Sequence, residues 1–468
     1  MKKKLLPALI VTGLIILVVI IMGITALINK YTPTKKTEDL KEYFNISSDD
    51  EAALIVDNEL SDYKAKIIDK KIYVDYKFVH DSLNSRFYWD ANENVLLYTT
   101  ASDIISAAAD SNSYSVTKQT NDFGYPIVKA TSDSALIALD YVKQYSNITF
   151  KSYDDPARIV ITSKWDEIDS ATVSKSTQVR VKGGIKSPIL KEVKKDDKIT
   201  ILDSGDKWDK VATEDGVIGY IKRKALSESK KTKLTNPDYE EETFTHIKKD
   251  KDICLAWNQV TSQSANSKVP QVISSTKGIN VMSPTWFYLN DNNGNLANIA
   301  SKDYVSYCHS QGIEVWGLFS NFENTDVDAA YVLTHTSTRT TLINQIMSAA
   351  FNYELDGVNI DFENITEAAY GDSYIEFIRE LAIKCHNNGI SLSVDVTVPA
   401  SFNKFFNRSD MANFADYIVI MGYDEHYKGS DAGSVSSIPW VTEGVESTLK
   451  EVPADQIILG MPFYTRIW

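Results

Sequence analysis

The sequence of 468 residues predicts a multidomain chain that ends in a (β/α)8 barrel of parallel strands. Three observations predict this organisation. A long apolar segment stands near the N-terminus, a strand-rich pattern repeats in the first part of the chain, and strands alternate with helices from residue 251 onward. Hydrophobic residues make up 43% of the chain, which is enough for packed cores and excludes a disordered protein. The net charge of −14 argues against a general nucleic-acid binder, which would carry a basic surface.

The N-terminal segment has the length of a membrane span. Lys2, Lys3 and Lys4 precede an uncharged run of 24 residues from Leu5 to Ile28, which can cross a hydrocarbon core of roughly 30 Å. A secretory signal peptide has a shorter apolar region and a small-residue cleavage site. We therefore expect residues 1–30 to be a cytoplasmic tip and an uncleaved transmembrane anchor, with a cleaved signal peptide as the alternative. The lysines favour a cytoplasmic N-terminus, which would place the rest of the chain outside the cell.

A repeated α/β module is expected after a polar linker at 31–45. Within residues 46–164, two stretches show strand, amphipathic segment, strand, turn and strand. These stretches are residues 70–100 and 135–163, about 64 residues apart. Such self-similarity predicts two copies of one small unit.

The repeat also resembles a known family. Trp89-Asp90 in the first copy corresponds to Tyr153-Asp154 in the second. The pattern is similar to the domain named after the N-terminus of copper amine oxidase. The resemblance implies no copper here, because the segment contains only one histidine, His80.

Residues 170–228 predict a small β-barrel, because short strands recur there between Gly- and Asp-rich turns. The strands are expected at TQVRVK, PILKEVK, KITILDS, WDKVATE and VIGYIKR. The segment resembles a bacterial SH3 domain at Val179-Arg180-Val181, Asp197-Lys198-Ile199, Trp208 with Lys210-Val211, and Gly219-Tyr220-Ile221. The resemblance implies either a binder of cell-wall peptide or a spacer, and Trp208 is either a core residue or a ligand platform. Residues 229–250 are charged and poor in aliphatics, and predict a linker.

Residues 251–468 alternate between strand and helix patterns, which predicts a parallel sheet, either open or closed into a barrel. Helices are expected between most strands, for example at Thr341–Asn352 and Ser373–Asn387. The expected strands are Ile253–Trp257, Ile279–Ser283, Ile313–Phe319, Gly357–Glu363, Ser391–Val398, Tyr417–Tyr423 and Ile457–Phe463. Only seven strands are present before Trp468, so we expect a fragment that lacks the eighth strand of a barrel.

The cysteines and histidines predict no metal site and no cofactor. Cys254, Cys308 and Cys385 have neither metal-site nor disulfide spacing, and we expect Cys308 and Cys385, each near the end of a probable helix, to be buried apolar residues. The six histidines include no HExxH pair.

The segment LDGVNIDFE at 355–363 carries the strongest functional signal. Side chains alternate along a strand, so Val358, Ile360 and Phe362 share one face, and the other face carries Asn359, Asp361 and Glu363. A buried parallel strand is normally apolar on both faces. Burial of carboxylates is costly unless they are paired or used, so the polar row predicts a site, with Glu363 at the mouth of the barrel. The alternative is a strand that simply ends in solvent.

Two carboxyl groups this close repel each other, so the pKa of one of them should rise. A general acid that works near neutral pH needs a raised pKa. Asp361 and Glu363 could therefore divide the work, one of them ionised and the other protonated.

The same segment resembles a family motif. DGVNIDFE is similar to the DGxDxDxE signature of glycoside hydrolase family 18, with Asp356, Asp361 and Glu363 at matching positions and Asn359 in place of the middle Asp. MGYD at 421–424 and GMPFY at 460–464 resemble the sixth and seventh strands of that family. The nearest branch acts on the bacterial cell wall and includes spore-cortex-lytic N-acetylglucosaminidases.

The resemblance implies a substrate-assisted mechanism. Glu363 would protonate the glycosidic oxygen, Asp361 would orient the 2-acetamido group of the sugar, and Tyr423 would hydrogen-bond the acetamido oxygen. Asn359 could donate a hydrogen bond to Asp361 and thereby shift the pH profile. The expected substrate-binding residues are Asp356, Asn359, Met421, Asp424, Trp286 and Tyr464. Aromatic residues near strand ends are either core residues or sugar platforms: Trp257, Trp286, Phe287, Trp316 and Phe322.

We therefore expect a membrane-anchored, extracellular, monomeric glycosidase that acts on peptidoglycan or a chitin-like polymer of N-acetylglucosamine. The alternative is a non-catalytic wall-binding or lectin-like protein, although such relatives typically lose the acid that Glu363 provides. A third hypothesis is action on another glycan, such as an N-glycan core.

Overall fold

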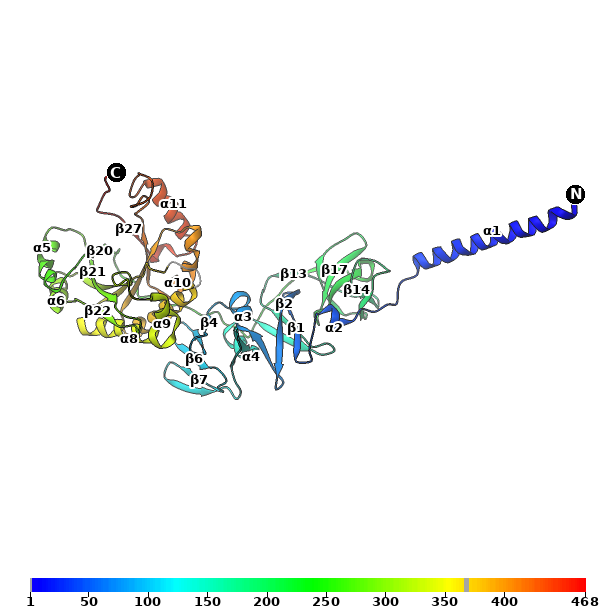
Figure 1. Ribbon diagram of the computed structural model, residues 1–468, viewed down its shortest axis with the longest axis horizontal. Coiled ribbons are helices and arrows are strands. Elements are labelled where there is room, and N and C mark those ends of the chain that lie inside the picture. Colours follow the sequence, from blue (N-terminus) through cyan, green and yellow to red (C-terminus); the bar gives the residue numbers. More distant parts are fainter. Residues whose placement is uncertain (1, 366–369) are drawn as a thin grey trace. The chain divides into compact units, whose positions relative to one another are not determined.

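The computed structural model of the protein describes residues 2–365 and 370–468. Its contacts divide the chain into two compact units (Figure 1). Unit 1 comprises the chain up to Phe78 together with Ile137–Glu240, and unit 2 comprises Val79–Leu136 together with Glu241–Trp468. The expected boundaries of a single module at 46–164 therefore differ from the observed division, because residues 79–136 join the C-terminal part of the chain.

The N-terminus of unit 1 is one apolar helix, α1 (Lys2–Tyr31). Within it, Leu9–Tyr31 has a mean hydropathy of 2.9 and is long enough to cross a membrane. A signal sequence would satisfy the same criterion. A short helix, α2 (Leu40–Tyr43), follows, and Asp39 caps its N-terminus.

The first sheet of unit 1 has the strand order β11-β12-β1-β2-β3-β10. The elements are β1 (Glu51–Val56), β2 (Glu59–Ile68), β3 (Lys71–Asp75), α3 (Tyr76–Ser82), β10 (Ala135–Ala138), α4 (Leu139–Tyr145), β11 (Thr149–Tyr153) and β12 (Arg158–Thr162). The predicted order of strand, helix, strand and strand occurs after both β3 and β10. In the second copy, the hairpin β11–β12 belongs to this sheet. In the first copy, the hairpin that follows α3 belongs to unit 2.

The second sheet of unit 1 is antiparallel and contains the five short strands expected after residue 170. Its strands are β13 (Glu167–Thr172), β14 (Thr177–Arg180), β15 (Ile189–Val193), β16 (Lys198–Asp203), β17 (Trp208–Thr213), β18 (Ile218–Lys222) and β19 (Lys230–Lys233), with a 3-10 turn at Arg223–Ala225. Val179, Val211 and Ile221 are fully buried in its core, where alternating positions of three strands meet.

Unit 2 is built around seven parallel strands that follow one another in chain order. They are β20 (Leu255–Asn258), β21 (Val281–Leu289), β23 (Glu314–Ser320), β24 (Gly357–Asp361), β25 (Ser391–Thr397), β26 (Tyr417–Met421) and β27 (Ile457–Gly460), and β22 (Leu296–Asn298) pairs with β21. The seven strands expected from the sequence are therefore all confirmed, with shifted ends. The closed barrel remains an expectation: in the described ranges, β20 and β27 stand at the two ends of the strand order.

Helices connect these strands, as right-handed parallel connections require. They are α5 (Val269–Ser274), α6 (Lys302–Ser310), α7 (Ala329–Thr334), α8 (Thr336–Tyr353), α9 (Gly371–His386), α10 (Arg408–Phe414) and α11 (Ile438–Thr448), with 3-10 turns at Gln263–Lys268, Ser401–Phe406 and Ala454–Gln456. The main core lies between the sheet and these helices. A second cluster is formed by Val281, Trp316 and Tyr417, near the start of three parallel strands.

Residues 79–136 form an antiparallel meander in unit 2. Its strands are β4 (Phe87–Asp90), β5 (Val95–Thr99), β6 (Ile104–Ala108), β7 (Ser113–Val116) and β8 (Gln119–Asp122), followed by β9 (Val128–Ala130). The meander bonds to the helices of the parallel domain. Asp90 accepts hydrogen bonds at 2.6 Å from both the N–H and the hydroxyl of Thr336, at the first turn of α8. Thr99 donates to Glu376 on α9 at 2.7 Å. These polar contacts tie the first hairpin to the helices of unit 2.

Candidate active site

The polar row of β24 faces away from the helices, as its alternation predicts. Val358, Ile360 and Phe362 are fully buried in the core against the helices, and Phe362 stacks on Phe377 of α9 at 5.4 Å. Asn359 and Asp361 point to the other side, where they meet side chains from β20, β21 and β25. The strand therefore separates an apolar packing face from a polar face.

Asn359 is the centre of a buried hydrogen-bond network. Its Oδ1 accepts from the indole N–H of Trp257 and from the hydroxyl of Ser283, each at 3.0 Å. Its Nδ2 donates to Ser393 Oγ at 3.0 Å and to Asp395 Oδ1 at 2.7 Å. The expected hydrogen bond from Asn359 to Asp361 was wrong, because the amide is directed across the sheet to β25 rather than along its own strand.

Asp361 lies deep in the polar face. Burial raises its pKa well above the usual range, and the nearby carboxyl groups of Asp395, Glu363 and Glu323 raise it further. Its Oδ1 is buried and has no hydrogen-bond partner among the residues that the structure describes. An acceptor oxygen is therefore available there for a donor from a substrate.

Glu363 follows the end of β24, and its side chain reaches solvent. Partial loss of hydration raises its pKa, with further contributions from the carboxylates of Asp424 and Glu323. The segment is tied to the neighbouring strand end, since the backbone N–H of Asn364 donates to Asn321 Oδ1 at 3.0 Å. A carboxyl group with a raised pKa at an open strand end has the properties of a general acid.

The sequence reasoning missed Asp395, which lies on β25 and is only 3% exposed. Burial raises its pKa to about 8, although hydrogen bonds from Asn359 and Trp257 oppose the rise. The alternation of Ser391, Ser393 and Asp395 with apolar residues could have revealed this second polar row. Glu323, just beyond β23, was missed as well, and it accepts a hydrogen bond from Ser320 at 2.6 Å.

The segment after β26 contributes the other predicted residues. Met421 is buried at the end of the strand. The ring of Tyr423 lies 6.2 Å from the rings of both Trp257 and Tyr464. Burial raises the pKa of Tyr423, and the carboxyl groups of Asp395, Asp361 and Glu363 add to the rise. The phenol therefore stays protonated and can donate a hydrogen bond near these carboxyl groups.

Asp424 adopts a left-handed backbone conformation, with a φ of 62°. Its Oδ1 accepts from the hydroxyl of Tyr464 at 2.8 Å and from Arg466 Nη2 at 2.6 Å. The sequence reasoning did not include Arg466. This pairing leaves Asp424 close enough to Glu363 to raise the pKa of that acid.

Two predicted substrate-binding residues lie elsewhere. Asp356 precedes β24 at its opposite end, where its Oδ2 accepts from the N–H of Val315 and bonds His309, each at 2.8 Å. Trp286 is fully buried, and its indole donates to Asn266 at 2.8 Å. Neither side chain can reach a sugar at Glu363, so both assignments are corrected: Asp356 ties two strands together, and Trp286 is a core residue.

The other aromatic candidates divide in the same way. Trp316 and Phe287 are buried in cores, whereas Phe322 is 42% exposed and Trp257 is half-buried. Among these candidates, Trp257 is the residue whose indole N–H donates a hydrogen bond to Asn359.

Residues 2–365 and 370–468 contain no group of three or more His, Cys, Asp or Glu side chains that could hold a metal ion. Cys308 and Cys385 are buried, and burial raises the pKa of the Cys308 thiol to about 12. Cys254 is exposed.

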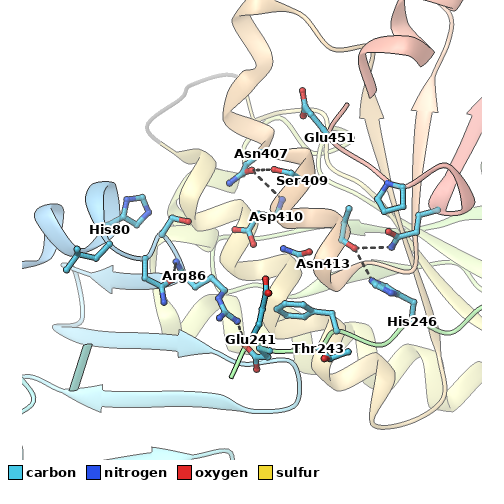
Figure 2. Close-up of a pocket in the computed structure, with 18 of the residues that line it drawn as sticks. His80, Arg86, Glu241, Thr243, His246, Asn407, Ser409, Asp410, Asn413 and Glu451 are labelled. Atoms are coloured by element: carbon cyan, nitrogen blue, oxygen red, sulfur yellow. Dashed lines mark hydrogen bonds and ion pairs between the residues drawn. The ribbon is translucent and has the colours of Figure 1, made fainter. Parts of the chain in front are cut away.

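A cavity of about 1120 Å³ in unit 2 is lined by His80, Arg86, His246, Asp410 and neighbours (Figure 2). Its lining does not include Asp361, Glu363 or Asp395. Two of its ionic groups are in ion pairs. Arg86 pairs with Glu242, and Asp410 pairs with Arg379. The cavity marks where the meander and the segment after residue 240 meet the parallel domain.

Parallel strands with acidic side chains at their carboxyl ends define an α/β enzyme-type domain with a carboxyl-based site. Residues 320–468 match the family profile described as Glycosyl hydrolases family 18. The match includes Asn359, Asp361, Glu363, Asp395 and Tyr423.

Known proteins are similar to part of this chain. The uncharacterized glycosylase YvbX of Bacillus subtilis is 25% identical over 192 residues, which cover 38% of this chain and 55% of that protein. A cortical fragment-lytic enzyme of Bacillus subtilis is 25% identical over 185 residues, which cover 38% and 43%. A chitinase structure from Chromobacterium violaceum has a TM-score of 0.40 and 21% identity, covering 45% of this chain and 68% of that one. The chain thus spans about half the length of these two curated relatives.

Proposed function

We propose that the protein is a glycosidase that hydrolyses a β-linked polymer containing N-acetylglucosamine, with Glu363 as its acid and base. One observation carries the proposal: Glu363 stands at the open end of β24, two residues after the half-buried Asp361, and the pKa of both carboxyl groups is raised. The family match over residues 320–468 supports the same reaction class.

In the first step, Glu363 donates its proton to the glycosidic oxygen while the bond from that oxygen to the anomeric carbon breaks. The carbonyl oxygen of the substrate's own 2-acetamido group attacks the anomeric carbon, which gives an oxazolinium ion. Asp361 accepts a hydrogen bond from the acetamido N–H through its unpartnered oxygen and opposes the positive charge of the ring. Tyr423 donates its phenolic hydrogen bond to the acetamido oxygen.

In the second step, Glu363 acts as the base. It takes a proton from a water molecule, and the resulting hydroxide attacks the anomeric carbon and opens the oxazolinium ion. The two inversions retain the configuration. Substrate assistance requires an N-acetylated sugar, which limits the substrates to peptidoglycan, chitin-like polymers and related glycans.

We favour peptidoglycan as the polymer, because a curated relative is a cortical fragment-lytic enzyme. Helix α1 would anchor the protein in the membrane with the catalytic unit outside the cell, and a cleaved signal peptide is the alternative. The antiparallel sheet of β13–β19 would be the SH3-like module, and the β3–α3 and β10–α4 repeat the amine-oxidase-like module. We expect the protein to act as a monomer.

The alternative is a wall-binding protein without catalysis, and one feature favours adhesion as an added role. A cleft of about 540 Å³ in unit 1 is lined by Trp208, Lys207, Lys222, Lys224 and neighbours. Lys222 lies over the Trp208 ring at 5.7 Å. An aromatic platform beside cations suits an anionic or sugar-bearing segment of a wall polymer.

The test is the release of reducing ends from purified peptidoglycan and from chitin oligomers. We expect Glu363→Gln to lose at least about 100-fold in kcat, because proton transfer by a positioned side chain contributes roughly that much. Glu354→Gln is the matched control, since this exposed carboxylate lies just before β24 at its far end. Equal activity of the wild type and Glu363→Gln would reject the enzymatic function, and binding to insoluble peptidoglycan would then support adhesion.

A further inference from the structure

The polar faces of β24 and β25 place two aspartates side by side: Asp361, whose Oδ1 is buried, and Asp395, which is buried as a whole. The strands are parallel and in register, with Asn359 opposite Ser393 and Ile360 opposite Val394. The next residue on each strand is an aspartate, Asp361 on one and Asp395 on the other. Neighbouring strands lie about 4.8 Å apart, so two side chains on the same face at this level are adjacent.

Asp395 is held firmly in this position. The amide of Asn359 donates to its Oδ1 at 2.7 Å, and the indole of Trp257 is a second donor to the same carboxyl group. Asp361, by contrast, has a buried Oδ1 without a partner among residues 2–365 and 370–468. One carboxyl group is thus fixed by donors, and its neighbour has an open acceptor position.

Two adjacent buried carboxyl groups cannot both be ionised without a large electrostatic cost. We propose that Asp395 is a positioning residue for Asp361: the two carboxyl groups share one proton across β24 and β25. Asp395 thereby supplies from β25 the proton-sharing group that Asn359 cannot supply from β24. This inference rests on the proposed glycosidase function and assigns a specific residue to it.

The shared proton moves within the pair during the reaction. When the acetamido N–H donates to Asp361, the O–H bond of Asp361 breaks and an O–H bond forms on Asp395. The pair keeps a charge of −1 throughout, and no proton is exchanged with solvent. Asp361 is then fully ionised beside the oxazolinium ion, and the proton returns when water opens the ring.

The surrounding groups favour a retained proton. The titratable groups that influence the pair are the carboxyl groups of Glu363 and Glu323 and the phenols of Tyr423 and Tyr374. Burial keeps both phenols protonated, and both carboxyl groups add negative potential. The donors Asn359 and Trp257 are neutral, so they orient Asp395 without neutralising the pair.

The test uses the full chain with Asp395→Asn, which preserves the shape of the side chain and removes its proton exchange. We expect kcat on peptidoglycan to fall by about 10- to 100-fold while KM changes by less than about threefold. The ionisation near pH 8 should disappear from the pH–rate profile. Ser391→Ala is the matched control, because Ser391 is a fully buried polar residue on the same face of β25, and it should leave rate and profile unchanged.

A compensating exchange gives the sharpest outcome. Asn359→Asp combined with Asp395→Asn returns a carboxyl group to β24 beside Asp361, and we expect it to recover at least about tenfold in kcat over Asp395→Asn alone. Wild-type rate and profile in Asp395→Asn would overturn the proposal, as would a double variant no faster than the single variant.

A measurement without substrate separates this inference from the proposed function. Because the pKa of Asp395 is about 8 in the folded chain and about 3.9 in an unfolded one, its contribution to stability is full at low pH and is lost as the pH rises toward 8. Between pH 5 and pH 8, the Tm of Asp395→Asn should therefore fall less than that of the wild type. If the wild type cleaves no polymer, the proposed glycosidase function is rejected. The comparison of Tm values still tests whether Asp361 and Asp395 share a proton. If the variant does not fold, carbon NMR of wild-type protein with labelled aspartate decides, and absence of any carboxyl titration above about pH 6 would overturn the inference.

Discussion

Trp257 on β20 donates its indole N–H to Asn359 Oδ1 on β24, and the two atoms lie 3.0 Å apart. The bond connects the first strand of the parallel sheet with the fourth. The same indole also donates toward Asp395 on β25. A single aromatic side chain thus fixes the amide and one carboxyl group of the site.

Trp257→Phe should keep the ring and remove the donor. We expect the free energy of unfolding to fall by about 1 kcal/mol, the usual net worth of one hydrogen bond. Because the indole holds the pKa of Asp395 down, its removal should raise that pKa and move the alkaline limb of the pH–rate profile upward. Urea unfolding and pH–rate measurements check both effects. Trp316→Phe is the control, since its indole donates to Glu314 near the start of β23, and an equal pH shift there would contradict the prediction.

Asn359→Asp should retain activity with a shifted pH profile. A carboxyl group at this buried position lies beside Asp361 and Asp395, and like charges raise one another's pKa. The new side chain also lacks the amide that donates to Asp395. We therefore expect the profile to move to higher pH. A profile with both limbs unaltered would show that position 359 does not communicate with the carboxyl pair.

Tyr423→Phe should lower kcat by about 100-fold, which is the usual effect of removing one donor that stabilises a transition state. The raised pKa of the phenol keeps it a donor throughout the working pH range. KM should change much less, since the ring and its contacts with Trp257 and Tyr464 remain. Steady-state kinetics on chitin oligomers give both constants. A loss confined to KM would instead assign Tyr423 to ground-state binding.

The row of Asn359, Asp361 and Glu363 could be predicted because strand alternation is local and has a period of two. Asp395 could not, because its place beside Asp361 depends on the register between two strands that are separated by a helix. Trp286 was misassigned for a related reason. Whether an aromatic ring near a strand end faces solvent depends on what covers it, and here the turn at Gln263–Lys268 supplies Asn266 as a buried partner.

The domain boundaries could not be predicted from local sequence patterns either. The order of strand, helix, strand and strand after β3 and β10 follows from local pattern. Which unit the β4–β5 hairpin joins depends instead on long-range contacts. The carboxylate of Asp90 accepts a hydrogen bond from Thr336, which lies 246 residues later in the chain. Long-range polar contacts of this kind leave no periodic signal.

Asp90→Ala should therefore destabilise unit 2 rather than unit 1. The variant removes the carboxylate oxygen that accepts both hydrogen bonds from Thr336 in the first turn of α8, which costs about 2 kcal/mol. Urea unfolding should show a lower midpoint for the transition of unit 2. Asp133→Ala, at an exposed position of the same segment, is the control and should change stability by less than about 0.5 kcal/mol. If the two variants unfold alike, the meander does not stabilise the catalytic domain. If only Asp90→Ala loses stability, residues 79–136 must be kept in any chain designed to carry the activity alone.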